Sequence, residues 1–296
     1  MRRRLTAPYY FRGIMNIQIR IGGIRFHFYS DEAFAVEESL SPFFCTDKGT
    51  CQVQVRVTLS LHPPQTTVPI SGEDLLLEYY YQPDGLVCLA KGGVGGYLAS
   101  THCDPDFTHI SCRIHRLPAG PETSLGTLMR TIPMRTILQR KGVMFFHAAQ
   151  IAVAGKGILF AAPSGTGKTT QAKLWQKYRE AKIICNDRTL VRKGMTYGYP
   201  IDGSEPIISG ERYPLGAIVF LAQGRENRIA PLGARDILLR LMPQMVMDTW
   251  DTQARALATE QLLGLVGKVP VYYFSCTPDE AAVECLENRL KMDGVL

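Results

Sequence analysis

Apolar and polar residues alternate along much of the first 120 residues, which is the repeat of a half-buried β-strand. The segments with this pattern are residues 16–28, 53–61, 75–93 and 108–117. Two of them predict hairpins, because a Gly-Gly pair interrupts the first and Pro83-Asp84-Gly85 interrupts the third. The pattern therefore predicts an N-terminal β-rich domain, residues 1–121, built as an antiparallel sheet.

After residue 121 the apolar residues change to helical spacing, with a break at Pro133. Beyond Gly142, predicted strands and helices alternate, which is typical of an α/β domain. The predicted strands cover residues 143–162, 182–185, 215–222 and 271–276, and the predicted helices cover 167–180, 234–245, 254–269 and 277–290. The expected fold is thus of α+β class overall, with a C-terminal domain, residues 122–296, in which strands and helices alternate.

The last predicted helix begins with a cap sequence. Thr277 is expected as the N-cap residue, and Pro278 as the first helical residue. Glu280 stands three residues after Thr277, which is the spacing of a capping box.

The composition is that of an ordinary globular protein, and it excludes several classes. The 296 residues are 46% hydrophobic and 20% charged. No run of about 18 apolar residues predicts a membrane span, and the first residues lack the apolar stretch of a secretory signal. We therefore expect a cytoplasmic protein without a membrane partner.

The net charge of +6 comes from one end of the chain. Residues 1–30 contain six arginines and no acidic residue, and the charges after them balance. The sequence therefore does not indicate a basic face on the body of the protein, and nucleic acid is not an expected partner.

Eight cysteines form no Cys-x-x-Cys pair, so we expect free thiols. Residues 102–115 are rich in Cys and His, which raises the alternative of a zinc site. In a strand, however, Cys112 faces away from His109 and His115, because successive side chains alternate between the two faces. The pattern therefore disfavours zinc in this segment.

Residues 160–171, FAAPSGTGKTTQ, join the end of an apolar run to a helical pattern. The segment matches the phosphate-binding loop G-x-x-x-x-G-K-[ST], except that Ala162 stands at the first glycine. Gly165 and Gly167 permit a curl in which backbone N–H groups point at a phosphate, and the following helix adds the positive end of its dipole. The sequence therefore predicts a nucleotide site.

The residue types of this loop suit the triphosphate of ATP. Lys168 supplies a positive charge to the β- and γ-phosphates, and Thr169 offers a hydroxyl to Mg²⁺. ATP and Mg²⁺ are therefore the expected cofactors. The expected nucleotide-binding residues are Pro163, Ser164, Gly165, Thr166, Gly167, Lys168, Thr169 and Thr170.

The loop also resembles that of a known family. Residues 163–170, PSGTGKTT, resemble the phosphate loop of ATP-dependent phosphoenolpyruvate carboxykinase. Over residues 142–222 the sequence resembles HPr kinase/phosphorylase and related bacterial kinases, which share the carboxykinase-like P-loop fold. The resemblance implies a C-terminal P-loop, phosphoenolpyruvate carboxykinase-like kinase domain. It does not extend to the N-terminal domain.

The resemblance implies catalytic residues as well. His147 matches a histidine before the loop strand in that family, and Asp187 and Arg188 match residues that follow the next strand. Asp187 is therefore the expected carboxylate that binds Mg²⁺ or accepts the proton of the attacking hydroxyl. The family has an acidic residue where this chain has Asn186, so the reverse, phosphorylase reaction is not implied.

Phosphoryl transfer requires neutralisation of charge, so we expect a further arginine near the loop. Arg212 is the candidate, because it lies in a Gly- and Pro-containing stretch before a buried strand, where a lid residue could sit. Each catalytic candidate also has a purely structural interpretation: a solvated charge for Arg212, a core histidine for His147 and a turn residue for Asp187.

The predicted function is transfer of the γ-phosphate of ATP to a hydroxyl. The acceptor is either a Ser or Thr of a peptide or small protein, or a small hydroxylated metabolite; an open sheet edge could hold a peptide by strand addition. The alternative is a nucleotide-binding regulatory module without phosphotransfer, which Asn186 favours. A carboxykinase-like enzyme is a third alternative, and a homo-oligomer stays open.

Overall fold

The computed structural model divides the chain into two compact units, each described here by itself. The first unit contains Met1–Arg20 and Ile24–Ile137, and the second contains Ile21–Gly23 and Leu138–Leu296. The division falls after Ile137, later than the expected end of the first domain at residue 121, because helix α1 (Leu125–Thr131) packs on the first sheet. The residues that the structure describes are 9–10, 15–32, 34–60, 70–92, 96–115, 124–201 and 209–296.

The first unit is built on a mixed sheet of eight strands among the residues that the structure describes. In spatial order they are β2 (Met15–Ile21), β3 (Ile24–Ser30), β5 (Val53–Ser60), β10 (His109–His115), β9 (Tyr97–Cys103), β8 (Gly85–Lys91), β7 (Leu77–Gln82) and β6 (Gly72–Glu73). A separate pair is formed by β1 (Tyr9–Tyr10) and β4 (Ala35–Val36), and a 3₁₀ helix, η1, spans Glu38–Phe43.

Both predicted hairpins of this unit are confirmed, as β2–β3 and β7–β8. Gly22 and Gly23 have φ values of 57° and 76°, which is the left-handed region that a tight two-residue turn requires. The predicted alternation is also confirmed in β10, where Ile110, Cys112 and Ile114 are buried and the residues between them are exposed.

The prediction of a purely antiparallel sheet is wrong. β5 is parallel to β3 on one side and to β10 on the other. The chain between Ser30 and Val53 contains β4 and η1, and it is long enough to return to the other end of the sheet so that β5 runs parallel to β3. A short turn, in contrast, would force the two strands to be antiparallel. After β5 the chain continues at the far edge of the sheet and returns as an antiparallel meander, which ends with β10 beside β5.

The second unit also has a mixed sheet of eight strands in its described part. Its main layer runs in the order β13 (Lys182–Cys185), β11 (Met144–Val153), β12 (Lys156–Ala161), β16 (Arg212–Gln223), β18 (Val271–Cys276) and β17 (Arg228–Pro231). The other two strands, β14 (Arg188–Arg192) and β15 (Met195–Gly198), connect the first half of β11 to the start of β16. The two units confirm an α+β fold of mixed type.

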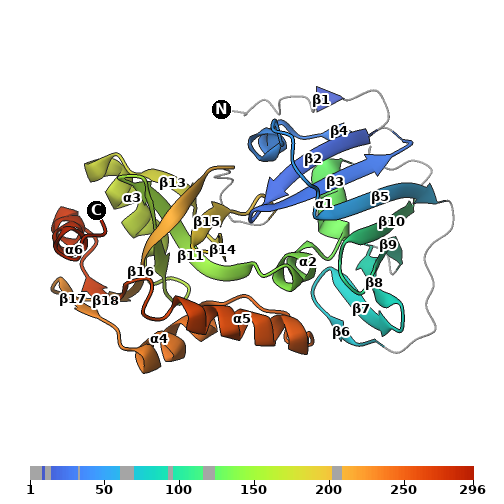
Figure 1. The fold of residues 1–296 in the computed structure, drawn as a ribbon. Coiled ribbons are helices and arrows are strands. Elements are labelled where there is room, and N and C mark those ends of the chain that lie inside the picture. Colours follow the sequence, from blue (N-terminus) through green and yellow to red (C-terminus); the bar gives the residue numbers. More distant parts are fainter. Residues whose placement is uncertain are drawn as a thin grey trace. The chain divides into compact units, whose positions relative to one another are not determined.

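Helices cover both faces of the main layer (Figure 1). One face carries α3 (Lys168–Arg179) and α6 (Glu280–Met292), whose Trp175 and Leu286 are fully buried in the core on that side. The opposite face carries α4 (Ala234–Leu241) and α5 (Thr252–Leu265), with Leu241 and Leu262 in a second core. The remaining helices are α2 (Met134–Arg140), which contains the boundary of the two units, and the 3₁₀ helix η2 (Met242–Gln244).

The helix cap expected at Thr277 is placed differently in the structure. Asp279 is the N-cap residue of α6, and its carboxylate accepts a hydrogen bond from the Ala282 N–H at 3.2 Å. The Thr277 hydroxyl instead donates to Asp279 Oδ1 at 2.8 Å and lies beside Asn227. A carboxylate at the N-cap also interacts favourably with the helix dipole, which explains why the helix begins two residues later than expected.

None of the helices that the structure describes combines the length and the apolar character needed to cross a bilayer.

Candidate functional site

The predicted phosphate loop lies between the end of β12 and the start of α3. Gly165 and Gly167 have φ values of 78° and 110°, in the region that favours glycine, and Gly167 is the N-cap residue of α3. Ala162, which replaces the first glycine of the motif, is fully buried and is not among the residues of positive φ. The loop therefore needs its glycines at the turn, while alanine is tolerated where the strand ends.

The loop presents backbone N–H groups to a ligand. The first four N–H groups of any α-helix have no partner inside the helix, and here they follow the curl at Gly165. A Cβ at Gly165 would meet no heavy atom within 4 Å, so there is open space beside this residue of the loop. This open curl with free donors fits a phosphate group.

The side chain of Lys168 points back to the first residues of the loop. Its Nζ donates hydrogen bonds to the carbonyl oxygens of Ala162 at 2.8 Å and Pro163 at 3.2 Å, and the residue is only 7% exposed. Burial lowers the pKa of the Lys168 ammonium group from its usual value, and the negative charge of Asp187 raises it in part. The ammonium group therefore lies at the end of the loop nearest Pro163.

Strand pairing brings His147 and Asp187 to the same edge of the sheet as the loop. β11 pairs antiparallel with β12, so that Ala148 lies opposite Ala161, the last residue of β12. The Ala148 N–H donates to the Asp187 carbonyl oxygen at 3.1 Å. His147 Nε2 lies 3.2 Å from Asp187 Oδ1, and the two side chains are 34% and 32% exposed. The histidine and the carboxylate thus form a pair beside the loop.

Positive charges near this pair affect the imidazole. Burial lowers the pKa of His147, and the charges of Lys168 and Arg188 lower it further, while Asp187 raises it. The net direction of the pKa is downward, which favours the neutral imidazole. A neutral imidazole with its proton on Nε2 can donate to the Asp187 carboxylate.

The residues available for a divalent metal are few. The described residues contain no group of three or more His, Cys, Asp or Glu side chains that could hold a metal ion. Mg²⁺ in phosphoryl-transfer sites uses one or two protein oxygens together with substrate phosphates and water. Thr169, in the first turn of α3, and Asp187 are oxygen donors of this type, so the chemistry of the site fits the predicted ion.

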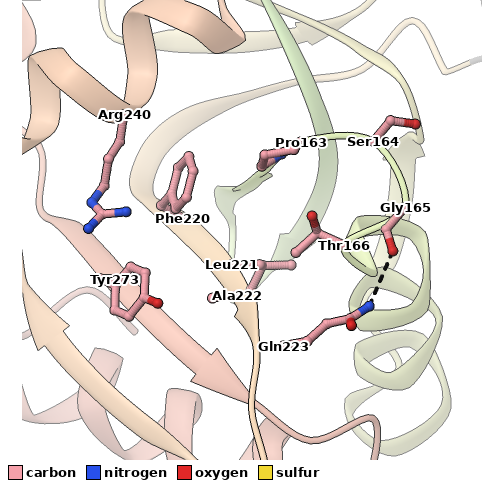
Figure 2. A pocket seen from close by; sticks show the side chains of 10 residues that line it. All are labelled: Pro163, Ser164, Gly165, Thr166, Phe220, Leu221, Ala222, Gln223, Arg240 and Tyr273. Atoms are coloured by element: carbon pink, nitrogen blue, oxygen red, sulfur yellow. Dashed lines mark hydrogen bonds between the residues drawn. The ribbon is translucent and has the colours of Figure 1, made fainter.

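A pocket of about 460 Å³ adjoins the loop on the side of β16. Figure 2 shows its lining, which consists of loop residues 163–166, residues 220–223 of β16, Arg240 of α4 and Tyr273 of β18. The Gln223 side chain donates from Nε2 to the Gly165 carbonyl oxygen at 3.3 Å and so connects the end of β16 to the loop.

Arg212, the predicted further arginine, does not lie with the other candidates. It is the first residue of β16, exposed, and paired with Tyr197 of β15. Because β16 is parallel to β12, the loop follows the opposite end of the strand, where Ala161 lies beside Phe220. The prediction of Arg212 as a lid residue at the loop is therefore not supported.

Arg240 is an arginine that lines the pocket beside the loop. Its guanidinium carbon lies 4.6 Å from the centroid of the Tyr273 ring and 5.4 Å from that of Phe220. The sequence shows Arg240 only as a polar residue of an amphipathic helix. The strand order that brings α4 beside the loop is a property of the tertiary fold, and no local signal reports it.

Three comparisons relate this chain to other proteins. The family model described as "SynChlorMet cassette protein ScmC" matches residues 112–290, which is more than half of the chain. No curated protein matches the sequence. Among solved structures, the HPr(Ser) kinase/phosphatase from Coxiella burnetii matches with 13% sequence identity and a TM-score of 0.30. That match covers 50% of this chain and 98% of the other, and a score of this size does not establish a shared fold.

Proposed function

The chain belongs to the family described as SynChlorMet cassette protein ScmC, and for this member we propose, from the residues of its own site, the function of an ATP-dependent phosphotransferase. The proposal rests on one observation: three groups suited to phosphoryl transfer lie together at one edge of the sheet. A glycine loop opens a helix, the buried Lys168 lies under the loop, and the His147–Asp187 pair lies beside it. This arrangement suits a polyphosphate whose terminal phosphoryl group reaches the carboxylate.

Each part has a task that its position allows. The loop N–H groups and the ammonium group of Lys168 neutralise the phosphate oxygens. Mg²⁺, held by Thr169 together with phosphate oxygens and water, would supply additional positive charge at the transferred group; Asp187 is its second candidate ligand, as the alternative to acting as the base. Asp187 accepts the proton of the acceptor hydroxyl, and His147 orients that carboxylate through its hydrogen bond.

The proposed step balances as an in-line displacement. The acceptor oxygen forms a bond to the γ-phosphorus while the bond from that phosphorus to the β–γ bridging oxygen breaks, and ADP leaves. The hydroxyl proton moves to Asp187. The acceptor is a hydroxyl compound, either a peptide or small protein or a small metabolite, acted on in the cytoplasm.

Consumption of ATP labelled at the γ-position tests the proposal. The wild-type chain, incubated with Mg²⁺ and a panel of hydroxyl acceptors, should transfer label, and Lys168→Ala should transfer none. Lys173→Ala is the matched control, because Lys173 is an exposed lysine of the same helix. Equal turnover by wild type and Lys168→Ala would remove the phosphotransferase proposal.

The alternative is a nucleotide-binding regulatory module, and a specific observation favours it. The position before Asp187 holds Asn186, which is 8% exposed and uncharged, so a single carboxylate of this pair is available for catalysis. Tight binding of ATP without formation of ADP, in the presence of every acceptor, would support this alternative.

A further inference from the structure

The pocket beside the loop contains a positive charge that the proposed transfer step does not use. Arg240 is the one charged residue among the described residues that line this cavity of about 460 Å³. The rest of the lining is polar or apolar, and the amide of Gln223 lies at the loop, where it donates to the Gly165 carbonyl oxygen (Figure 2). A lining of this kind favours an anionic ligand over a cationic one.

Two aromatic rings lie beside the guanidinium group of Arg240. The Phe220 and Tyr273 rings stack with their centroids 6.5 Å apart and an angle of 17° between their planes. The guanidinium carbon of Arg240 lies within cation–π distance of both rings, at 5.4 Å and 4.6 Å. Contact with both rings restricts the movement of the guanidinium group before a ligand binds, which favours recognition of an oxyanion.

The charge of Arg240 is not balanced within the described part of the chain. Its Nε atom is buried there without a hydrogen-bond partner, and no described carboxylate forms an ion pair with it. A partly buried guanidinium without an anion is unfavourable, because burial removes water that nothing replaces. An oxyanion bound in the pocket would supply the missing partner.

The pocket adjoins the end of the loop where transfer would occur. Lys168, which interacts with the β- and γ-phosphates in loops of this type, directs its ammonium group to the carbonyl oxygens of Ala162 and Pro163. Pro163 and Ser164 also line the pocket. The hydroxyl of an acceptor held in the pocket would therefore meet the terminal phosphate beside Pro163 and Ser164, on the side from which Asp187 can accept its proton, whereas the nucleoside would extend towards the helix.

From these observations we propose that the Arg240 pocket binds the oxyanion of a small hydroxylated acceptor, either a carboxylate or a phosphate ester. This inference rests on the proposed phosphotransferase function, and it selects a small anionic metabolite from the acceptor classes considered. Arg240 would hold the acceptor by its anionic group, so that its hydroxyl faces the γ-phosphoryl group.

Nuclear magnetic resonance of ¹⁵N-arginine-labelled full-length protein tests the site directly. The buried Nε–H of Arg240 should give a signal protected from exchange, assigned by its loss in Arg240→Lys, or in Arg240→Gln if the lysine variant does not fold. The probes are glycerate, glycerol 3-phosphate and neutral glycerol, added at constant ionic strength with sodium chloride.

We expect a saturable shift of this signal with glycerate or glycerol 3-phosphate at concentrations up to about 10 mM, and none with glycerol. Which anion binds more tightly separates a carboxylate acceptor from a phosphate ester. If neither anion shifts the signal beyond the chloride control, the pocket is not an oxyanion site and the inference is wrong.

A second measurement separates this site from a nucleobase site. Arg240→Gln should bind ATP and inorganic tripolyphosphate with the same affinities as the wild type. Weaker binding of ATP alone would assign the pocket to the base and overturn the inference. If the anion binds but labelled ATP is never consumed, the pocket assignment survives while the phosphotransferase proposal fails.

Discussion

His147 Nε2 lies 3.2 Å from Asp187 Oδ1, a contact between two residues that are far apart in sequence. The contact exists because β11 pairs both with β13, which ends just before Asp187, and with β14, which begins just after it. The pair therefore depends on strand register, and a one-residue slip of β11 would direct His147 to the other face of the sheet.

We predict that His147 titrates below pH 6.5 in the folded protein, because burial and the nearby positive charges disfavour the imidazolium form. Lys168→Met should raise the pKa of His147, since it removes a positive charge, and Asp187→Asn should lower it, since it removes a negative one. Histidine signals followed by nuclear magnetic resonance from pH 4 to 8 would measure all three values. A wild-type midpoint above 6.5, or no change in Lys168→Met, would contradict the electrostatic description of the site.

Asp187→Asn should abolish turnover while nucleotide binding persists. The amide keeps the shape of the side chain but cannot accept the hydroxyl proton, so we expect kcat to fall by about 10²–10⁴-fold. The affinity for ATP without metal, measured by calorimetry, should change by no more than about twofold. Glu260→Gln makes the same chemical change at an exposed position of α5 and should leave both quantities unaltered. Full activity in Asp187→Asn would exclude Asp187 as the base.

Gly167→Ala should destabilise the second unit and weaken nucleotide binding. With φ at 110°, an alanine at this N-cap position is strained by about 1–2 kcal/mol or more. Gly264→Ala is the matched control, because that glycine lies in α5 and its Cβ would meet open space. The control should increase stability by about 0.5–1 kcal/mol. Thermal unfolding of both variants would show opposite signs, and equal effects would contradict the loop conformation described.

Arg212→Ala should leave consumption of ATP within about twofold of wild type, as expected for an exposed residue away from the site. The reason is its position at the start of β16, while the loop adjoins the other end of that strand. Steady-state rates at saturating ATP would measure this. A loss of tenfold or more would return Arg212 to the list of functional residues and would require the segment before β16 to reach the loop.

Local patterns predicted the strands and the loop of the site, but they did not predict the direction or the pairing of the strands. A largely apolar stretch predicted the strands around His147, and the Gly-Lys-Thr spacing predicted the loop at Lys168. Period-two alternation is the same in parallel and antiparallel strands, so β5 was predicted to have antiparallel neighbours, although both are parallel. Long connections, in contrast to tight turns, do not fix direction.

The two arginines show the same limit. Arg212 was selected because it precedes a buried strand, but a sequence does not show which end of that strand faces the loop. Arg240 lies on α4. This helix reaches the pocket because β16 and β18 follow β12 in the order of the sheet, and both strands contribute to the pocket lining. Residues that approach a site through strand order are therefore not recognisable from spacing alone.

The N-cap of α6 gives a final prediction, because the sequence pattern indicates Thr277 as the N-cap residue whereas the structure has Asp279 there. Asp279 accepts from the Ala282 N–H and also receives the Thr277 hydroxyl, so Asp279→Ala should lower the free energy of unfolding by about 1 kcal/mol. Glu280→Ala should cost less than about 0.5 kcal/mol, because Glu280 lies in the first turn and closes no capping box. Denaturant unfolding of the two variants decides between the assignments: a Thr277 capping box would make Glu280→Ala the more damaging change, whereas an Asp279 cap makes it the milder one. Asp279→Ala also removes the acceptor of the Thr277 hydroxyl. Thr277 directly follows β18, and its carbonyl oxygen accepts a hydrogen bond from Gln171 of α3 at 3.3 Å, so part of the loss in stability comes from this end of the sheet.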